Sequence, residues 1–246
     1  MLEKTEERFM DKELKIDMHV HSSGISFCSH ATCEEIITYK KSLGYDGAVL
    51  TNHCQAWYYA AEKQQDFMRS VVEEFKRGKA YADERNFRFY LGIEVTITDP
   101  AYSDWLLYGV TEEALLRAPC LYRLNQRQLF SFCQENGIVL IQAHPYRKAS
   151  YCDDQHPGEV KYLHGVEINC SPGDIERRGD ILEFAEKNNV TVTCGTDYHG
   201  DRRIFGGTLL PATVQTGEDI AEYLRTTDKT RIFLEKEILE IPVRRK

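Results

Sequence analysis

The sequence predicts an α/β fold in which a mostly parallel sheet is closed, or nearly closed, into a barrel. Seven short apolar runs alternate with amphipathic segments of helical length, and this alternation is typical of parallel strands joined by crossover helices. Polar residues with metal-binding chemistry also gather at the ends of these runs. Barrels of this kind carry their functional residues at the carboxyl ends of the strands, so the two observations agree.

The seven apolar runs have the length and the β-branched content of buried strands. They lie at 15–21, 46–53, 87–97, 104–110, 137–144, 164–169 and 190–199. A further segment, 230–241, is predicted to be either a terminal strand or an extended tail. We expect a single domain over residues 1–246, with a core at about 15–228, an N-terminal lead at 1–14 and the strand or tail at 229–246.

Helices are predicted between these runs. The clearest is 32–44, because Thr32 is a favourable N-cap residue, Glu35 completes a capping box, and Gly44 follows the last turn. A long amphipathic helix is predicted at 59–84, which Gly78 could break. The remaining predicted helices are 124–137, 173–189 and 216–226.

The composition narrows the classes of function. The chain has 39 acidic and 31 basic residues, a formal net charge of −8, whereas a broad nucleic-acid-binding surface would need a basic face. Long nucleic acid is therefore a weaker expectation than a small substrate. No run is long enough to span a bilayer, and the charged N-terminal segment does not resemble a secretory signal. We expect a cytoplasmic protein with no membrane association and with reduced cysteines, while its oligomeric state stays open.

Seven side chains that can bind metals fall at the ends of five runs. His19 and His21 close the first run, and residues two apart on a strand point to the same side. Asp197 and His199 form a similar pair at the end of the last run. The set is completed by His53, Glu94 and His144. Imidazoles and carboxylates bind hydrolytic zinc, manganese or iron, and seven ligands exceed the needs of one tetrahedral ion. The sequence therefore predicts a metal-dependent hydrolase with more than one ion.

Each of these residues, taken alone, also has an ordinary structural explanation. A histidine near a strand end is more often a hydrogen-bonded polar residue than a ligand, Glu94 could pair with an arginine, and Asp197 could serve a turn before Gly200. The agreement of five strand ends favours the metal site, because buried imidazole pairs are costly without compensation. In the loop after the first run, Cys28 and His30 are both candidates for a further ligand.

The motifs IDMHVHSS, AVLTNH, GIEV, QAHP and GTDYHG, taken together over residues 15–200, resemble the PHP (polymerase and histidinol phosphatase) family of metal-dependent phosphoesterases. The resemblance implies a distorted seven-stranded, TIM-like β/α barrel with its site at the C-terminal strand ends. It also implies two or three divalent ions, zinc, manganese or iron, and the hydrolysis of phosphomonoesters or phosphodiesters.

Carried over position by position, the resemblance implies three ion sites. The first would be held by His19, His21, Glu94 and Asp197. Glu94 would bridge to a second ion that is also held by His144. The third would be held by His53 and His199.

The sequence departs from the family pattern at two places. Asn52 stands where the second motif usually has an aspartate. The family often has a histidine just before the strand predicted at 104–110, and here Trp105 is nearest to that position. Asp104 could substitute for the missing ligand of the second ion.

We therefore expect a phosphoesterase that hydrolyses a small phosphorylated metabolite or nucleotide by attack of metal-bound hydroxide on phosphorus. Asp197 and His199 are predicted to orient the attacking water or to handle its proton. Phosphate oxygens are predicted to bind Arg147, Arg202 and Arg203, with solvated surface charge as the alternative for each. The rival functions are a barrel hydrolase acting on C–N or carboxylic ester bonds, a nuclease, and a non-catalytic or degenerate PHP metal-binding module.

Overall fold

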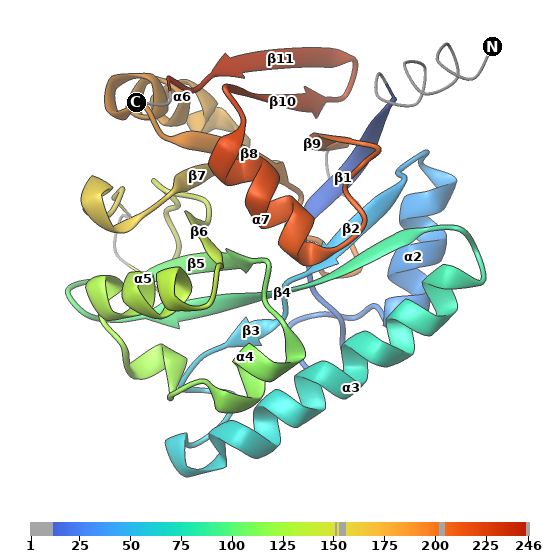
Figure 1. Cartoon of the computed structure of the whole chain (residues 1–246), viewed down its shortest axis with the longest axis vertical. Helices are drawn as coiled ribbons and strands as arrows, with labels where there is room; N and C mark the ends of the chain where they lie inside the picture. Colours follow the sequence, from blue (N-terminus) through green and yellow to red (C-terminus); the bar gives the residue numbers. More distant parts are fainter. Residues whose placement is uncertain (1–11, 151, 153–155, 202–204, 245–246) are drawn as a thin grey trace.

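The computed structural model describes residues 12–150, 152, 156–201 and 205–244. Its strands form one mixed sheet that curls into a nearly closed barrel (Figure 1). The barrel closes where the segment that follows the strand at 191–195 meets the end of the strand at 13–20. There the backbone amide of His21 donates to the carbonyl of Tyr198 (2.9 Å), and the backbone amide of Tyr198 donates to the carbonyl of His19 (3.3 Å). The strands are β1 (Glu13–Val20), β2 (Gly47–Leu50), β3 (His53–Cys54), β4 (Arg88–Ile97), β5 (Ser103–Tyr108), β6 (Val139–Gln142), β7 (Gly165–Asn169), β8 (Thr191–Gly195), β9 (Gly206–Pro211), β10 (Lys229–Leu234) and β11 (Glu237–Pro242).

The sheet has the order β11-β10-β9-β1-β2-β4-β5-β6-β7-β8, with β3 paired to β4. Each of the seven predicted runs contains a strand, but the prediction of seven strands in total is wrong. The segment of β9 has two glycines and a short apolar stretch, which gave little strand signal. The segment 230–241 forms a hairpin of β10 and β11 rather than a tail.

The prediction of a mostly parallel sheet is also wrong. Within the described residues, five strand pairs are parallel and five are antiparallel. Three of the antiparallel pairs join β1, β9, β10 and β11, and the other two arise because β5 runs antiparallel to both β4 and β6. A parallel connection needs a crossover of a dozen or more residues, and the short link after β4 allows only a hairpin.

The helices of the described residues are α2 (Cys33–Ser42), α3 (Gln64–Asp83), α4 (Glu112–Arg117), α5 (Gln126–Glu135), α6 (Arg178–Asn188) and α7 (Gly217–Thr226). The five predicted helices are present, and α4 was not predicted. The capping box of Thr32 and Glu35 is formed. The expected break at Gly78 is wrong, because α3 is continuous. Gly78 instead allows close packing, since a Cβ there would lie 2.7 Å from the Phe89 ring and 2.8 Å from Cys33 Cβ.

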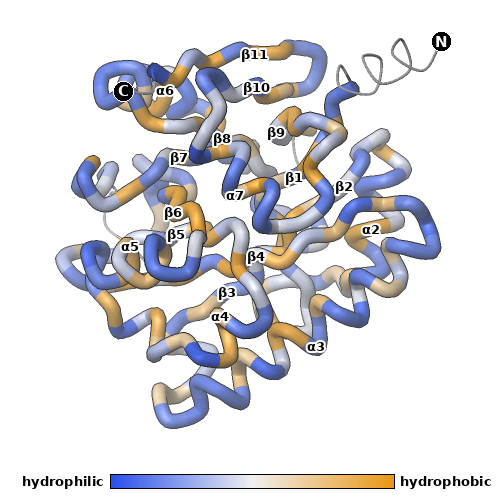
Figure 2. Tube along the Cα trace, in the orientation of Figure 1, coloured by the Kyte–Doolittle hydropathy of each residue, from blue (hydrophilic) through white to orange (hydrophobic). Residues whose placement is uncertain are grey.

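The arrangement of apolar residues explains how the barrel holds together. The strands are largely apolar and the covering helices alternate apolar and hydrophilic positions (Figure 2). Helices α2 and α3 lie against the side of the barrel formed by β2 and β4, and α7 packs on residues of β1, β4, β5 and β6. Among the described helices, none combines the length and apolar character that crossing a bilayer requires.

Candidate metal centre

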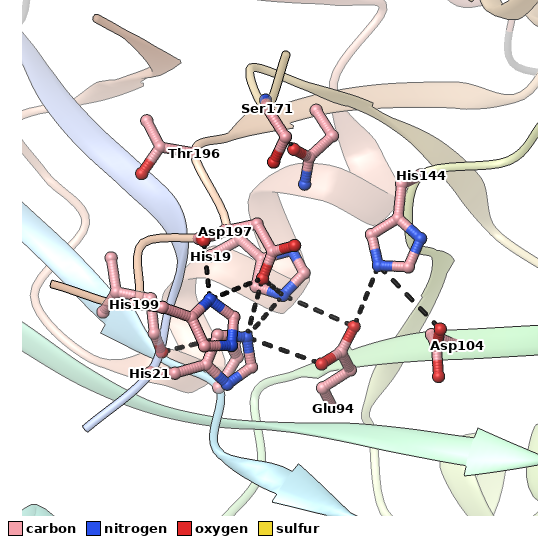
Figure 3. Close-up of polar contacts among 12 residues, drawn as sticks. His19, His21, Glu94, Asp104, His144, Ser171, Thr196, Asp197 and His199 are labelled. Carbon is pink, nitrogen blue, oxygen red and sulfur yellow. Dashed lines mark hydrogen bonds and ion pairs between the residues drawn. The ribbon is translucent and has the colours of Figure 1, made fainter. Parts of the chain in front are cut away.

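Five strands bring all seven predicted ligands together, and Figure 3 labels six of them, all except His53. His19 lies near the end of β1 and His21 just after it, while the short strand β3 places His53 directly opposite Glu94 of β4. His144 follows β6, and both Asp197 and His199 follow β8. Four overlapping groups have ligand atoms within 4.8 Å of one another: His19/His21/Glu94, His19/His144/Asp197, Glu94/Asp104/His144 and His21/His53/His199.

The first group surrounds the two histidines of β1. Asp197 Oδ1 lies 3.1 Å from His21 Nε2 and 3.4 Å from His19 Nε2. Glu94 approaches the same nitrogens, with 3.4 Å to His19 and 3.5 Å to His21. Ligands bound tetrahedrally to one ion at about 2.0–2.1 Å are about 3.3 Å apart. These side chains are therefore spaced as ligands of a common ion.

Glu167 on β7 fixes the orientation of His19. Its Oε1 lies 2.9 Å from His19 Nδ1, and a carboxylate can only accept, so Nδ1–H donates. The Oε2 atom is held by the backbone amide of His144 (3.1 Å) and by Asn169 Nδ2 (3.0 Å). Glu167 thus fixes which edge of the His19 ring faces the cluster and leaves Nε2 as the atom that a metal ion could bind, as in metal-binding histidines with a carboxylate behind them.

Arg147 fixes the orientation of Asp197. Its Nη2 donates to Asp197 Oδ2 (2.7 Å) and to Asp174 Oδ2 (2.5 Å). The other carboxylate oxygen of Asp197 thereby faces the histidines. Asp197 has a φ of 52° and His144 a φ of 29°, a backbone region that non-glycine residues adopt rarely and mainly at functional sites.

The second group lies between β4 and β5. His144 Nε2 is 3.1 Å from Glu94 Oε1 and 4.0 Å from Asp104 Oδ2 (Figure 3). Because β5 is antiparallel, its first residues lie at the same edge of the barrel as the carboxyl ends of the parallel strands. Asp104 faces the cluster, whereas Trp105 points to the other side of β5 and is buried in the apolar core. Of these two residues, both considered from the sequence for a ligand position, Asp104 is therefore the one that lies beside Glu94 and His144.

The third group is formed by histidine rings. The ring of His21 stacks on those of His53 and His199, with centroids 4.2 and 4.3 Å apart. His53 Nδ1 also lies 2.6 Å from Glu94 Oε2, which connects this group to the first. Hydrogen bonds from His199 and His53 lower the pKa of the Cys28 thiol to about 5, although its burial acts in the opposite direction.

Four atoms of the cluster are buried and form no hydrogen bond of good geometry in the described part of the chain. They are Glu94 Oε2, Asp197 Oδ1, His53 Nδ1 and His144 Nδ1, and the first three contact other members of the cluster only as ion pairs. A buried polar atom without a partner costs about 1–3 kcal/mol, and more when it is charged. Such atoms, aimed at one another from different strands, fit a site for divalent cations.

The charges of the cluster respond to one another. Burial alone would raise the pKa of Glu94 and of Asp197, but His53 and His19 lower the first well below its usual value, and His19 and Arg147 lower the second. Burial raises the pKa of Asp104, and the charge of Glu94 raises it further. Closely spaced carboxylates in a buried site favour a compensating cation.

Comparisons with known proteins identify the fold. No family model matches the chain, and no curated protein matches it. Among solved structures, a two-domain protein of Bacteroides vulgatus that contains a predicted PHP-like metal-dependent phosphoesterase superposes with a TM-score of 0.64 at 16% identity, over 92% of this chain and 66% of that one. This chain has the PHP-like fold. It spans about two thirds of the length of that two-domain protein.

Two further structures share the PHP-like fold. PsfC from Pseudomonas syringae has a TM-score of 0.62 at 16% identity, over 90% of this chain and 91% of that one. The lesion-specific endonuclease Q of Pyrococcus furiosus has a TM-score of 0.54 at 13% identity, over 87% of this chain and 56% of that one. The resemblance drawn from the five sequence motifs is therefore confirmed for the fold.

The other residues predicted for the site differ in how they lie relative to the metal cluster. A cavity of about 720 Å³ lies against the cluster, and its wall includes Cys28, His30 and Arg147. The thiol of Cys28 faces the third group, whereas His30 is exposed and donates its backbone amide to His199. Arg147 is engaged with two carboxylates, so its contact with a phosphate stays a prediction. Arg202 and Arg203 lie outside the described residues.

Sequence reasoning assigned no role to a buried network behind the cluster. Asp17 of β1 accepts from the amides of His19 (3.2 Å) and Thr196 (3.0 Å) and from the Thr196 hydroxyl (2.6 Å). Lys40 of α2 completes the network, 2.5 Å from Asp17 Oδ2 and 2.9 Å from Thr196 Oγ1. The spacing of Asp17, two residues before His19, was the available signal. Glu167, two residues before the end of β7, carried a similar signal.

Proposed function

We propose that this chain is a metal-dependent phosphoesterase of the PHP type that acts on a small phosphorylated substrate. The observation that carries the proposal is the set of buried ligand atoms without hydrogen bonds, Glu94 Oε2, Asp197 Oδ1 and His53 Nδ1, which converge from three strands. A PHP-like phosphoesterase and an endonuclease share the fold, and both names denote the hydrolysis of phosphate esters.

Three ion positions are assigned from the overlapping groups of ligands. The first would be held by His19, His21, Glu94 and Asp197, the second by Glu94, Asp104 and His144, and the third by His21 or Cys28 together with His53 and His199. Divalent ions of zinc, manganese or iron in such a site activate water and neutralise the charge of a phosphate. Glu94 belongs to two of these groups and contacts the third through His53.

The chain's own residues set the geometry of the reaction. Arg147 holds Asp197 so that Oδ1 faces the cluster, and this oxygen can orient the attacking water. His199 Nδ1 lies 2.8 Å from the carbonyl of Asp197, which can only accept, so its Nε2 is directed away from that carbonyl. We assign the orientation of water to Asp197, while proton transfer by His199 stays a prediction.

The cavity favours a small phosphate ester. Its volume of about 720 Å³ is in the usual range for small-molecule sites. Arg147 and Lys148 supply positive charge on one wall, while Asp174 and Asp201 lie on the same lining. A single phosphate is compatible with this mixture, whereas a polyanion would meet repulsion from the carboxylates.

The test is a substrate screen with the metal content measured on the same sample. Purified protein, supplied in turn with Mn²⁺, Zn²⁺ or Fe²⁺, is assayed on phosphomonoesters, phosphodiesters, amides and carboxylic esters. We expect turnover of phosphate esters, with a loss of at least about 10³-fold in Asp197→Asn, because one orienting group contributes on this scale. His156→Ala, which removes a histidine outside the cluster, is the matched control and should keep full activity.

The other outcomes separate the rival functions. Turnover of amides or carboxylic esters alone would replace phosphate chemistry, and less than one ion per chain together with no turnover would indicate a degenerate module. Endonuclease Q has been solved with a 27-mer duplex carrying an abasic lesion at its active site, so nucleic acid is the second candidate. Cleavage of a lesion-containing duplex at a higher kcat/KM than any small ester would favour that candidate.

A further inference from the structure

A second cavity adjoins the metal centre. It has a volume of about 410 Å³ and shares Gln55, Trp57 and Tyr102 with the lining of the first cavity. The wall between the two cavities is thin at β4 and β5, because Thr96 lines the second cavity and donates a hydrogen bond of 2.6 Å to Asp104, which lines the first. A molecule bound at the metal centre can therefore extend over this rim into the second cavity.

Trp57 forms the rim between the two cavities and is unusually exposed for a tryptophan. It is 78% exposed although it lines both cavities, whereas Trp105, the other tryptophan of the chain, is 1% exposed. A large exposed aromatic ring at the edge of a pocket marks a binding surface, because its apolar area gains from being covered. Flat aromatic rings, such as nucleic-acid bases, stack well on indole.

The second cavity also offers polar groups for the edge of a ring. Gln55 and Thr98 can both donate and accept, Asp99 accepts and Arg123 donates. Such a mixture suits a heterocycle with donors and acceptors on its rim. Asp99 in this cavity and the carboxylates of the first one disfavour a second phosphate or a longer nucleic acid.

We infer that Trp57 is a stacking platform for the base of a nucleoside monophosphate, whose phosphate lies at the metal centre and whose base enters the second cavity. This inference rests on the proposed function and narrows its substrate class. Trp57 acts on binding and specificity, not on the reacting atoms. Its removal should therefore weaken the binding of a nucleotide and leave a phosphate ester without a ring unaffected.

The experiment measures binding to the wild-type protein loaded with Zn²⁺. The phosphonate analogues of adenosine 5′-monophosphate and of ribose 5-phosphate, which cannot be hydrolysed as esters, are the two probes, and tryptophan fluorescence is the readout. Stacking should quench Trp57, while buried Trp105 supplies a constant background. We expect quenching by the nucleotide only, and a 5- to 150-fold weaker nucleotide affinity in Trp57→Ala, measured by calorimetry, since stacking of one base is worth about this factor.

Two controls make the result specific. Trp57→Phe keeps a stacking ring and should retain nucleotide affinity within about 3-fold, and Ile238→Ala removes an exposed apolar side chain of β11 and should change nothing. Equal affinity for both probes, or an unchanged affinity in Trp57→Ala, overturns the inference. Failure of this inference can be distinguished from failure of the proposed function. Hydrolysis of phosphate esters without a preference for a ring refutes only the stacking site. Ring-dependent binding without any phosphoesterase turnover refutes only the proposed phosphoesterase function.

Discussion

Replacing Lys40 with methionine tests whether the buried network behind the metal centre holds the fold together. Lys40 is 2% exposed and its ammonium group lies 2.5 Å from Asp17 Oδ2 and 2.9 Å from Thr196 Oγ1. The rings of Tyr45 and Tyr198 lie 5.0 and 4.7 Å from the same nitrogen. Methionine fills similar space but leaves the carboxylate of Asp17 buried without its cation.

The magnitude follows from what Asp17 retains. Removal of one partner of a buried ion pair costs about 3–5 kcal/mol. Asp17 keeps three hydrogen bonds, from the amides of His19 and Thr196 and from the Thr196 hydroxyl, so we expect the lower end, about 3 kcal/mol. With an m-value of about 3 kcal/mol/M, the midpoint of urea unfolding should fall by about 1 M.

The assay is equilibrium urea unfolding of metal-free protein, followed by circular dichroism. Lys41→Met is the matched control, because the neighbouring lysine of α2 is exposed and its side chain bonds, among the described residues, only to the carbonyl of Arg85. The resulting loss of unfolding free energy should stay within about 0.5 kcal/mol. The double variant Asp17→Asn/Lys40→Met should be less destabilised than the sum of its two single changes. A loss below 1 kcal/mol in Lys40→Met, with an unchanged m-value, would refute the reasoning.

Three further predictions concern the centre itself. Glu167→Gln weakens the hydrogen bond that orients His19, so the affinity for divalent ions, measured by titration calorimetry, should fall about 10- to 100-fold. Gly195→Ala places a Cβ 2.4 Å from His19 Cβ and 2.7 Å from Glu167 Oε1, and should cost about 1–3 kcal/mol of unfolding free energy; Gly179→Ala in α6, where the added Cβ meets nothing within 4 Å, should cost nothing. In metal-free protein the depressed pKa of Asp197 stabilises the fold above the ordinary carboxylate pKa of about 4, and this contribution is lost as the pH falls further. Urea unfolding between pH 7 and pH 3 should therefore show a steeper acid loss in the wild type than in Asp197→Asn, and equal slopes would contradict the assigned charge.

Much of the barrel could be predicted from the sequence because each central strand is a short apolar run with distinct ends. The capping box of Thr32 and Glu35 predicted the start of α2 for a similarly local reason. Strand direction could not be read from apolar content, since parallel and antiparallel central strands are equally buried. The length of the link between β4 and β5 did contain that information, but a pattern search for strands does not use it.

The residues of the candidate site also differ in whether the sequence predicts them. His19, His21, Asp197 and His199 were found because spacing by two residues at a strand end is a local signal. The supporting contacts of Glu167 and Lys40 depend on residues 148 and 23 positions away from their partners His19 and Asp17. Such distant pairs leave no trace in the spacing of a single sequence. Only the folded chain shows that these charges meet.

The reversal of β5 also explains how the second group gains its carboxylate. Sites in parallel barrels draw on residues that follow the strands, and a strand of opposite direction presents its first residues at that edge instead. Asp104 is the second residue of β5, pairs in register with Thr96 of β4, and accepts a hydrogen bond from the Thr96 hydroxyl. That bond fixes one oxygen of Asp104 and leaves the other, Oδ2, as the one nearer to His144. A search for ligands only after strands would pass over this residue. On the proposed assignment, a carboxylate from the adjacent position, held by a hydrogen bond across the hairpin, would take the place of the family's usual histidine.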